Sequence, residues 1–351
     1  MFAAKNELFT RPSGGFVIPR SLRFRASASA YLTRTFGTPT DVKTQTLSLW
    51  IKRGLLGNGA AEYYLLTTGT GGTECRLVFN TDDTFTVFLN NVTYRTTTQV
   101  FRDPAAWYHI VVNWDTTQAT ASDRASVYVN GQKVTSFGSA TYPTLNQNLV
   151  VDTSGYTDFI GYSNGGGVFL QVTNFDGYMA EYNRVDGQAL TPSSFGAFDS
   201  AGIWQPLTYT GTYGTNGFYL PFTDNSALTT SSNVGLGKDF SGNGNYWTTN
   251  NISITAGVTY DSMTDVPTLT SATASNFAVL NPLDNATPTL TNANLTPTSG
   301  GSWGSRRSTI GVTSGKWYCE VTSGGSTANV MLGVISDSSF SGTTYIGAQT
   351  Q

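Results

Sequence analysis

Short segments of alternating apolar and polar residues, separated by turns rich in Gly and Asn, recur along most of this chain. Residues 46–53 and 107–114 place apolar side chains at every second position, which is the period of a β-strand with one buried face. Residues 126–134 contain Asn130-Gly131 between two such segments, and this pair favours a two-residue hairpin turn because both positions need positive φ. The chain has only five Glu residues, so helices are disfavoured. We therefore predict an all-β fold.

The composition excludes several classes of protein. Charged residues make up 12% of the 351 residues, about half the usual share of roughly 25%. The 20 Phe, 18 Tyr and 7 Trp residues supply more apolar area than a disordered chain contains. A net charge of −3 disfavours nucleic-acid binding. The chain has no apolar run long enough to cross a membrane, and its two Cys residues provide neither a disulfide framework nor a zinc site.

Alternating strands joined by short turns are typical of a β-sandwich or barrel. Thr191-Pro192-Ser193-Ser194 predicts one short helix, with Thr191 as its cap and Pro192 at its first position. Because the strands alternate and are not apolar throughout, we expect each sheet to leave one face in contact with water.

Four segments resemble successive strands of concanavalin A-like, laminin-G-type jelly-roll domains. They are Ser48–Arg53, Trp107–Trp114, Val127–Gly131 and Phe175–Glu181, and their order and spacing match over residues 21–200. The resemblance implies two large antiparallel sheets, one of them concave. It also implies a ligand site at one rim, with Ca²⁺ in some members of the family.

A second block resembles the linker region of modular marine bacteriophage fibre and virion proteins. It comprises Gly217–Phe222 and Lys238–Trp247. In those proteins a laminin-G-like domain precedes a SPRY-like domain, and Arg307–Val321 resembles the start of the latter. Val330–Ile335 would be its next strand. We therefore expect a partial, β-rich SPRY-like module that is incomplete at residue 351.

These observations divide the chain into five parts, which begin with a basic N-terminal arm. We expect the arm to attach the protein to its particle, although a solvated tail would have the same composition. The basic residues predicted for attachment are Lys5, Arg11 and Arg20, together with Arg23 just after the arm. The parts are the arm (1–20), the jelly roll (21–200), a Gly/Asn-rich β block that packs on or continues the jelly roll (201–260), an extended Thr/Ser/Pro-rich connector (261–305) and the SPRY-like module (306–351).

The sequence disfavours catalysis. Glycosidases on this fold need two carboxylates flanking the scissile bond. Glu181 has no second Glu four or five residues away, and Asp176 and Asp186 lie five positions from it, on the opposite face of a regular strand. His109 is the single histidine, and its apolar strand predicts a histidine of the core or sheet face, hydrogen-bonded locally. We expect no enzyme.

Binding residues are predicted in loops. Aromatic rings beside turns suit sugar rings, and the candidates for glycan binding are Tyr162, Asn164, Tyr213, Tyr246 and Trp247. No cofactor is required, but oxygen ligands in Gly-broken loops would suit Ca²⁺. The candidate ligands are Asp224, Asp239, Asn243 and Asn245. Asp and Asn are also the ordinary residues of tight turns, so this alternative stays open.

Taken together, the sequence predicts a structural protein of a bacteriophage virion, either a tail fibre or a head or tail appendage. It would assemble in the host cytoplasm and be released by lysis. Its partners would be other virion proteins, a host surface glycan and further copies of itself, with a trimer favoured, and neither nucleic acid nor a membrane. The alternatives are a glycan depolymerase on the same fold and a bacterial cell-surface adhesin.

Overall fold

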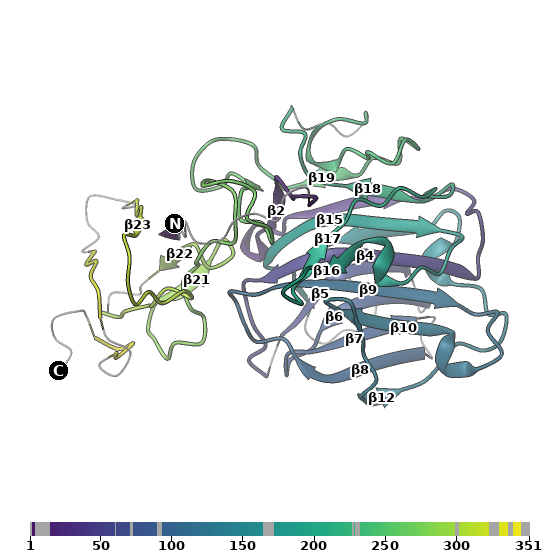
Figure 1. Cartoon of the computed structure of the whole chain (residues 1–351), viewed down its shortest axis with the longest axis horizontal. Helices are drawn as coiled ribbons and strands as arrows, with labels where there is room; N and C mark the ends of the chain where they lie inside the picture. The colour runs from purple at the N-terminus through teal and green to yellow at the C-terminus, as the bar shows by residue number, and fades with distance from the viewer. Residues whose placement is uncertain are drawn as a thin grey trace.

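A computed structural model of the protein describes residues 2–3, 15–59, 61–70, 73–89, 93–163, 172–226, 228, 232–298, 302–322, 330–335 and 340–344. In this part of the chain two large sheets lie face to face (Figure 1), which confirms the predicted all-β sandwich. None of the helices in these ranges is long and apolar enough to cross a membrane. Those helices are short 3₁₀ turns: η1 (Ala26–Ala28), η2 (Ala121–Asp123), η3 (Val150–Asp152), η4 (Pro192–Ser194) and η5 (Gly235–Gly237).

The first sheet, called the β4 sheet below, has the order β11-β10-β9-β4-β15-β2-β20, and β18 also pairs with β15. β4 runs antiparallel to β9 from Thr44, opposite Asp115, to Lys52, opposite Trp107. Asn130 and Gly131 have φ values of 47° and 79°, as predicted for the turn that joins β10 to β11. The strands are β2 (Ser21–Phe24), β4 (Thr44–Arg53), β9 (Trp107–Asp115), β10 (Ala125–Val129), β11 (Gln132–Lys133), β15 (Gly177–Asp186), β18 (Phe218–Leu220) and β20 (Ser262–Met263).

The second sheet, called the β5 sheet below, has the order β12-β8-β7-β6-β5-β13-β3-β19, and β14 pairs with β5 in parallel. Burial along β7 alternates between inward and outward positions, as the sequence predicts for a strand with one face in water. The strands are β3 (Tyr31–Thr35), β5 (Glu62–Thr70), β6 (Thr73–Phe79), β7 (Thr84–Leu89), β8 (Thr93–Val100), β12 (Phe137–Ala140), β13 (Thr157–Ile160), β14 (Val172–Asn174) and β19 (Thr248–Asn250).

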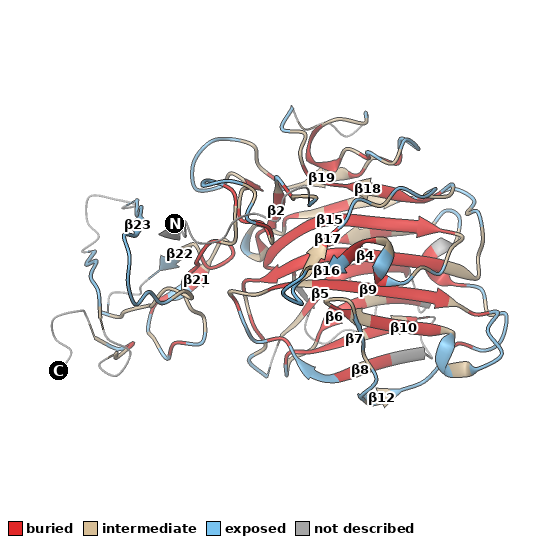
Figure 2. Ribbon diagram, viewed as in Figure 1, coloured by how far each residue is buried: buried red, intermediate tan, exposed pale blue. Residues whose placement is uncertain are grey.

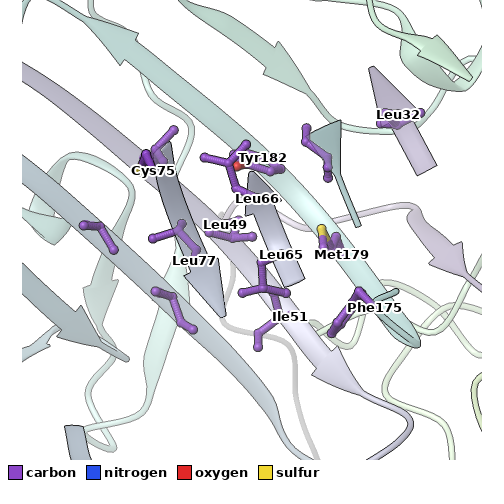
Figure 3. Packing of buried hydrophobic residues seen from close by; sticks show 14 of the residues in the cluster. Leu32, Leu49, Ile51, Leu65, Leu66, Cys75, Leu77, Phe175, Met179 and Tyr182 are labelled. Atoms are coloured by element: carbon purple, nitrogen blue, oxygen red, sulfur yellow. The ribbon is translucent and has the colours of Figure 1, made fainter. Parts of the chain in front are cut away.

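The main core lies between the two sheets. Leu49 and Ile51 of β4 point toward Leu65 of β5 and Leu77 of β6 (Figure 3). All four side chains are buried. Removing apolar area of this kind from water contributes about 25 cal/mol per Å² to folding, so the apolar half of each alternating strand holds the sandwich together.

The outer face of the β4 sheet is also buried. Every position of β15, and every position of β4 after Thr44, is buried (Figure 2). Apolar residues from 18 and 263–293 pack on Trp50, Trp107 and Tyr178 of this face. The expectation that each sheet leaves one face in contact with water is therefore wrong for this sheet.

Polar residues on the covered face are paired with the segment that covers them. Nζ of Lys52 lies 2.7 Å from Oδ2 of Asp265, and Nε1 of Trp107 donates to the same carboxylate at 3.1 Å. Arg23 and Arg25 both contact Asp261, at 3.1 and 2.8 Å. The start of the segment 261–305, expected as a connector, is thus held on the sheet by the buried ion pairs of Asp261 and Asp265.

The segment after β15 covers a second part of this face, around Val111 and Val185. It forms η4, a single 3₁₀ turn with Pro192 at its start, which confirms the predicted short helix. Thr191 occupies the N-cap position, but its side chain makes no capping hydrogen bond and pairs with the hydroxyl of Ser193. It continues into a hairpin of β16 (Gly196–Phe198) and β17 (Trp204–Pro206). Figure 1 shows this hairpin in front of β4 and β9.

The C-terminal part lies beside the sandwich, at the left of Figure 1. It contains a hairpin of β21 (Thr289–Thr291) and β22 (Thr296–Thr298), and β23 (Tyr318–Cys319), which pairs with β1 (Phe2–Ala3). Residues 330–335, expected as a strand, have no regular secondary structure, and Val334 is 98% exposed. The SPRY-like resemblance of residues 306–351 stays a prediction.

Candidate functional site

The aromatic residues predicted to bind glycan do not form one site. Trp247 is 1% exposed and packs against Phe218 in the core, so its ring faces do not reach a ligand. Tyr162 stacks on Tyr31 at a centroid distance of 4.5 Å, beside the β5 sheet.

The other three candidates are also separate. Tyr213 packs on the outer side of the β4 sheet and donates to Asn183. Tyr246 is half-buried beside the guanidinium of Arg34. Asn164 lies outside the described residues.

The predicted calcium ligands are occupied by local hydrogen bonds. Asp239 accepts from the backbone N–H groups of Tyr219, Ser241 and Asn245. The amides of Asn243 and Asn245 donate to backbone carbonyls, and Asp224 pairs with Lys238 at 3.3 Å. No group of three His, Cys, Asp or Glu residues in the described ranges could hold a metal ion. The structure thus uses these side chains as turn residues.

The basic residues predicted for the N-terminal arm have different surroundings. Arg23 is 2% exposed, and its guanidinium contacts Asp261 and two backbone carbonyls, so its charge is used within the fold. Arg20 donates to the carbonyl of Ser262. Lys5 and Arg11 lie outside the described residues.

Glu181 is the most perturbed carboxylate on the β4 sheet. It is 6% exposed, at a bulge in β15, and its φ of 50° is unusual for a residue with a side chain. Burial raises its pKa to about 7, and the hydrogen bond from Tyr219, at 2.6 Å, opposes that increase. Oε1 of Glu181 has no hydrogen-bond partner in the described part of the chain. This side chain lies beneath the surface and not in a cleft for a substrate.

A hollow of about 440 Å³ opens on the outer side of the β4 sheet, between the β10–β11 turn and the η4–β16–β17 segment. Its volume lies in the range of small-molecule sites. The side chains that line it are aromatic, small or hydroxylated, and none carries a charge at neutral pH: Tyr128, Gly131, Thr191, Pro192, Ser193, Gly196, Ala197, Phe198 and Trp204.

His109 positions Trp204 as a wall of this hollow. Nε1 of Trp204 donates to Nδ1 of His109 at 2.9 Å, so the proton of the neutral imidazole lies on Nε2, which donates to the hydroxyl of Ser48. Burial lowers the pKa of His109 to about 3, which keeps the ring neutral. The sequence prediction of a locally bonded histidine on the sheet face is confirmed, but the sequence did not indicate its partner.

Two glycines make room for the indole. A Cβ at Gly131 or at Gly196 would lie 2.4 Å from an atom of the Trp204 ring, which no side chain tolerates without movement. The sequence indicated Gly131 as a turn residue, but not as a neighbour of Trp204. Trp204 and Gly196 were missed, because nothing local in the sequence relates residues 196–204 to a turn more than sixty residues earlier.

The comparison with protein families agrees with this fold. Residues 26–196 match the model of the concanavalin A-like lectin/glucanases superfamily. This match supports the predicted resemblance of this part of the chain to concanavalin A-like, laminin-G-like domains, and the two-sheet sandwich is consistent with it. The match includes Tyr128, Gly131 and η4 but ends before Trp204.

Solved structures with a similar fold come from several sources. A heptameric SAP-like pentraxin from Limulus polyphemus is 19% identical, covers 50% of this chain and 75% of its own, and has a TM-score of 0.34. The mouse laminin α1 domains LG4-5 are 13% identical, with 60% and 51% coverage and a TM-score of 0.35. The CBM40 of a Ruminococcus gnavus IT-sialidase, bound to α2,3-sialyllactose, is 12% identical, with 42% and 89% coverage and a TM-score of 0.29. No curated protein matches the chain.

Proposed function

We propose that this protein is a non-catalytic, carbohydrate-binding structural protein of a bacteriophage particle, either a tail fibre or an appendage of the head or tail. The observation that carries the binding part is the uncharged hollow beside Trp204 in a lectin-like domain. Sugars have an apolar ring face that packs on aromatic side chains, and hydroxyls that pair with Thr and Ser side chains.

Glycan binding is tested with Trp204→Ala against a set of host surface polysaccharides. We expect at least a tenfold loss of affinity, since the variant removes the aromatic wall of the hollow. Trp317→Ala is the matched control, because Trp317 is also partly exposed, at 41%, and does not line the hollow. Equal affinity of both variants and the unaltered protein would contradict binding at the hollow.

The assignment to a particle is supported by the resemblance of residues 238–247 to phage virion proteins, and by a surface chemistry of hydroxyls with few charges. Mass spectrometry and imaging of purified virions should find the chain in a fixed copy number. Its absence from particles and presence on the bacterial surface would identify an adhesin instead.

The basic N-terminus is proposed as the attachment segment. Ile18 is fully buried against the β4 sheet, so a truncation that tests attachment must end before it. A chain that lacks residues 1–14, and with them Lys5 and Arg11, should fold but fail to enter particles. Normal incorporation would refute this role.

The absence of catalysis is proposed because Glu181 has no second Glu four or five residues away, and self-association is proposed because the chain has few charges and many hydroxyls. Incubation with the bound polysaccharide should release no reducing sugar, and sustained release would identify a depolymerase. Light scattering of the purified protein should give the mass of a homo-oligomer, with three copies expected, whereas a monomer at micromolar concentration would contradict that expectation.

A further inference from the structure

A second hollow, of about 220 Å³, lies next to the first on the outer side of the β4 sheet. Tyr128 lines both hollows, so its ring stands between them. The second hollow is polar, and its other lining residues are Asn113, Asp115, Gln118, Asp123, Ser126, Lys133 and Ala189.

One segment of the chain walls both hollows. Ala189 lines the second, polar hollow. Residues from Thr191 to Trp204 line the first hollow, which is called the apolar hollow below. The amide of Asn113, from β9, donates to the carbonyl of Leu190 at 2.7 Å, and this bond fixes the segment where the two hollows meet. The two hollows therefore share the segment 189–204 as well as Tyr128.

The two hollows differ in charge. The apolar hollow has no charged lining. In the polar one, Nζ of Lys133 lies 3.8 Å from Asp123, which offsets one of its two carboxylates. Burial raises the pKa of Asp115, but hydrogen bonds from Thr117 and Gln118 outweigh it and lower the pKa below its usual value. Asp115 forms no ion pair with any described residue, so it carries the remaining negative charge of the polar hollow.

We propose that the two hollows form one groove that binds an oligosaccharide without acidic groups, with one sugar ring in each hollow and Tyr128 between them. The proposal rests on the glycan binding proposed above and specifies the ligand class. The apolar hollow takes a ring face against Trp204. The polar hollow takes hydroxyls, which donate to carboxylate and amide oxygens, whereas a uronic or sialic acid there would meet the charge of Asp115.

The test measures binding of glucose, galactose and mannose, each as monosaccharide and trisaccharide, and of the corresponding uronic acid trisaccharides. Neutral trisaccharides should bind at least tenfold more tightly than their monosaccharides, because only they occupy both hollows. The acidic trisaccharides should bind more weakly, by at least about fivefold, which is the repulsion between two like charges about 4 Å apart at the dielectric constant of bulk water.

Variants separate this proposal from the one it rests on. Tyr128→Ala should abolish the advantage of the trisaccharide, while Tyr128→Phe, which retains the ring, should keep most of it. Asp115→Asn should reduce the discrimination against acidic trisaccharides. Melting curves report whether Tyr128→Ala still folds. If it does not, the proposal is decided by the ratio of trisaccharide to monosaccharide affinity in Tyr128→Phe and by the ratio of neutral to acidic trisaccharide affinity in Asp115→Asn.

Different outcomes refute either the carbohydrate site or the groove proposed from it. If no neutral sugar binds, or if binding does not depend on Trp204, the carbohydrate site itself is refuted. If binding depends on Trp204 but trisaccharides bind no better than monosaccharides, or acidic trisaccharides bind equally well, the hollow binds sugar and the two-part groove is refuted.

Discussion

The outer faces of the two sheets start from the same sequence pattern and end in different surroundings. On the β5 sheet, Tyr31, Thr33 and Phe159 are half-exposed. On the β4 sheet, the corresponding outward residues Trp50 and Lys52 are buried under a segment from more than two hundred residues later. The difference lies in what covers each face and not in the strands themselves.

Alternation in a strand reports which side chains face the core, but not whether the opposite face meets water. A polar residue on the outward side is stable in both cases, since either water or a buried partner satisfies it. On the covered face the partners are side chains such as Asp265 and Asp261. The stability of the protein should therefore depend far more on single partner residues at the covered face than at the exposed face.

The largest expected effect comes from Asp265→Ala. Asp265 is 2% exposed and holds Lys52, which is fully buried, at 2.7 Å. Removal of one partner of a buried ion pair leaves an uncompensated charge and costs about 3–5 kcal/mol. Denaturant unfolding followed by Trp fluorescence measures the loss.

The double variant Lys52→Met/Asp265→Leu is the control. It removes both charges and should recover most of the loss, because no buried charge then lacks a partner. If the double variant were as unstable as Asp265→Ala, the cost would come from packing and from the hydrogen bonds that Trp107 and Phe277 donate to Asp265, and not from the charge.

A second prediction concerns Glu181. Because its pKa is raised to about 7 in the folded state and is near 4.3 when unfolded, the native state binds its proton more tightly. This contribution is fully present below pH 4 and is lost as the pH rises through 7. The loss amounts to roughly 4 kcal/mol at most.

Glu181→Gln should remove that dependence. The variant should gain stability relative to the unaltered protein as the pH rises from 5 to 8, measured by unfolding at fixed temperature. The other carboxylates are common to both proteins and cancel in the difference. A difference that stays constant over this range would show that Glu181 does not titrate there.

Local features of the fold were predictable from the sequence because they depend on neighbouring residues. The Asn130-Gly131 turn follows from the φ values that these residues favour, and the start of η4 follows from the preference of Pro192 for a first helical position. The cover of the β4 sheet was not predictable, since pairing Lys52 with Asp265 requires knowing which of many distant acids returns to that strand.

The candidate site shows the same limit. Thr191, Ser193 and Gly131 lie in recognisable turns, yet only folding brings them to Trp204, and the aromatic residues chosen for their neighbouring turns include Trp247, which is in the core. Loop position alone does not separate a binding aromatic residue from a packing one.

A third prediction tests the fit of Trp204 on the covered face. Gly196→Ala places a Cβ 2.4 Å from its ring, so the indole must move, at a cost of about 1–3 kcal/mol for overpacking. The affinity for sugar should also fall, because the indole of Trp204 moves from its place in the hollow. Gly138→Ala, where nothing lies within 4 Å of the added atom, is the matched control and should leave both stability and affinity unchanged.

The smallest predicted effect compares two threonines, one on each outer face. Thr46 on the β4 sheet is fully buried; it donates to the carbonyl of Gln188 and accepts from the N–H of Leu190. Thr35 on the β5 sheet is exposed and bonds only to another threonine hydroxyl among the described residues. Thr46→Ala leaves a buried N–H and carbonyl unpaired and should cost about 1–2 kcal/mol, whereas water replaces the hydroxyl partner in Thr35→Ala, at well under about 1 kcal/mol.

Chemical denaturation of the two variants in parallel measures this difference. Both substitutions remove the same hydroxyl and methyl groups from a strand, and the buried methyl group of Thr46 adds its lost packing to the cost of the unpaired groups. Equal losses would mean that the segment over the β4 sheet opens to water readily in solution. A loss confined to Thr46→Ala would instead mean that the cover is as firmly packed as the sandwich, and that the hollow beside Trp204 has a rigid wall.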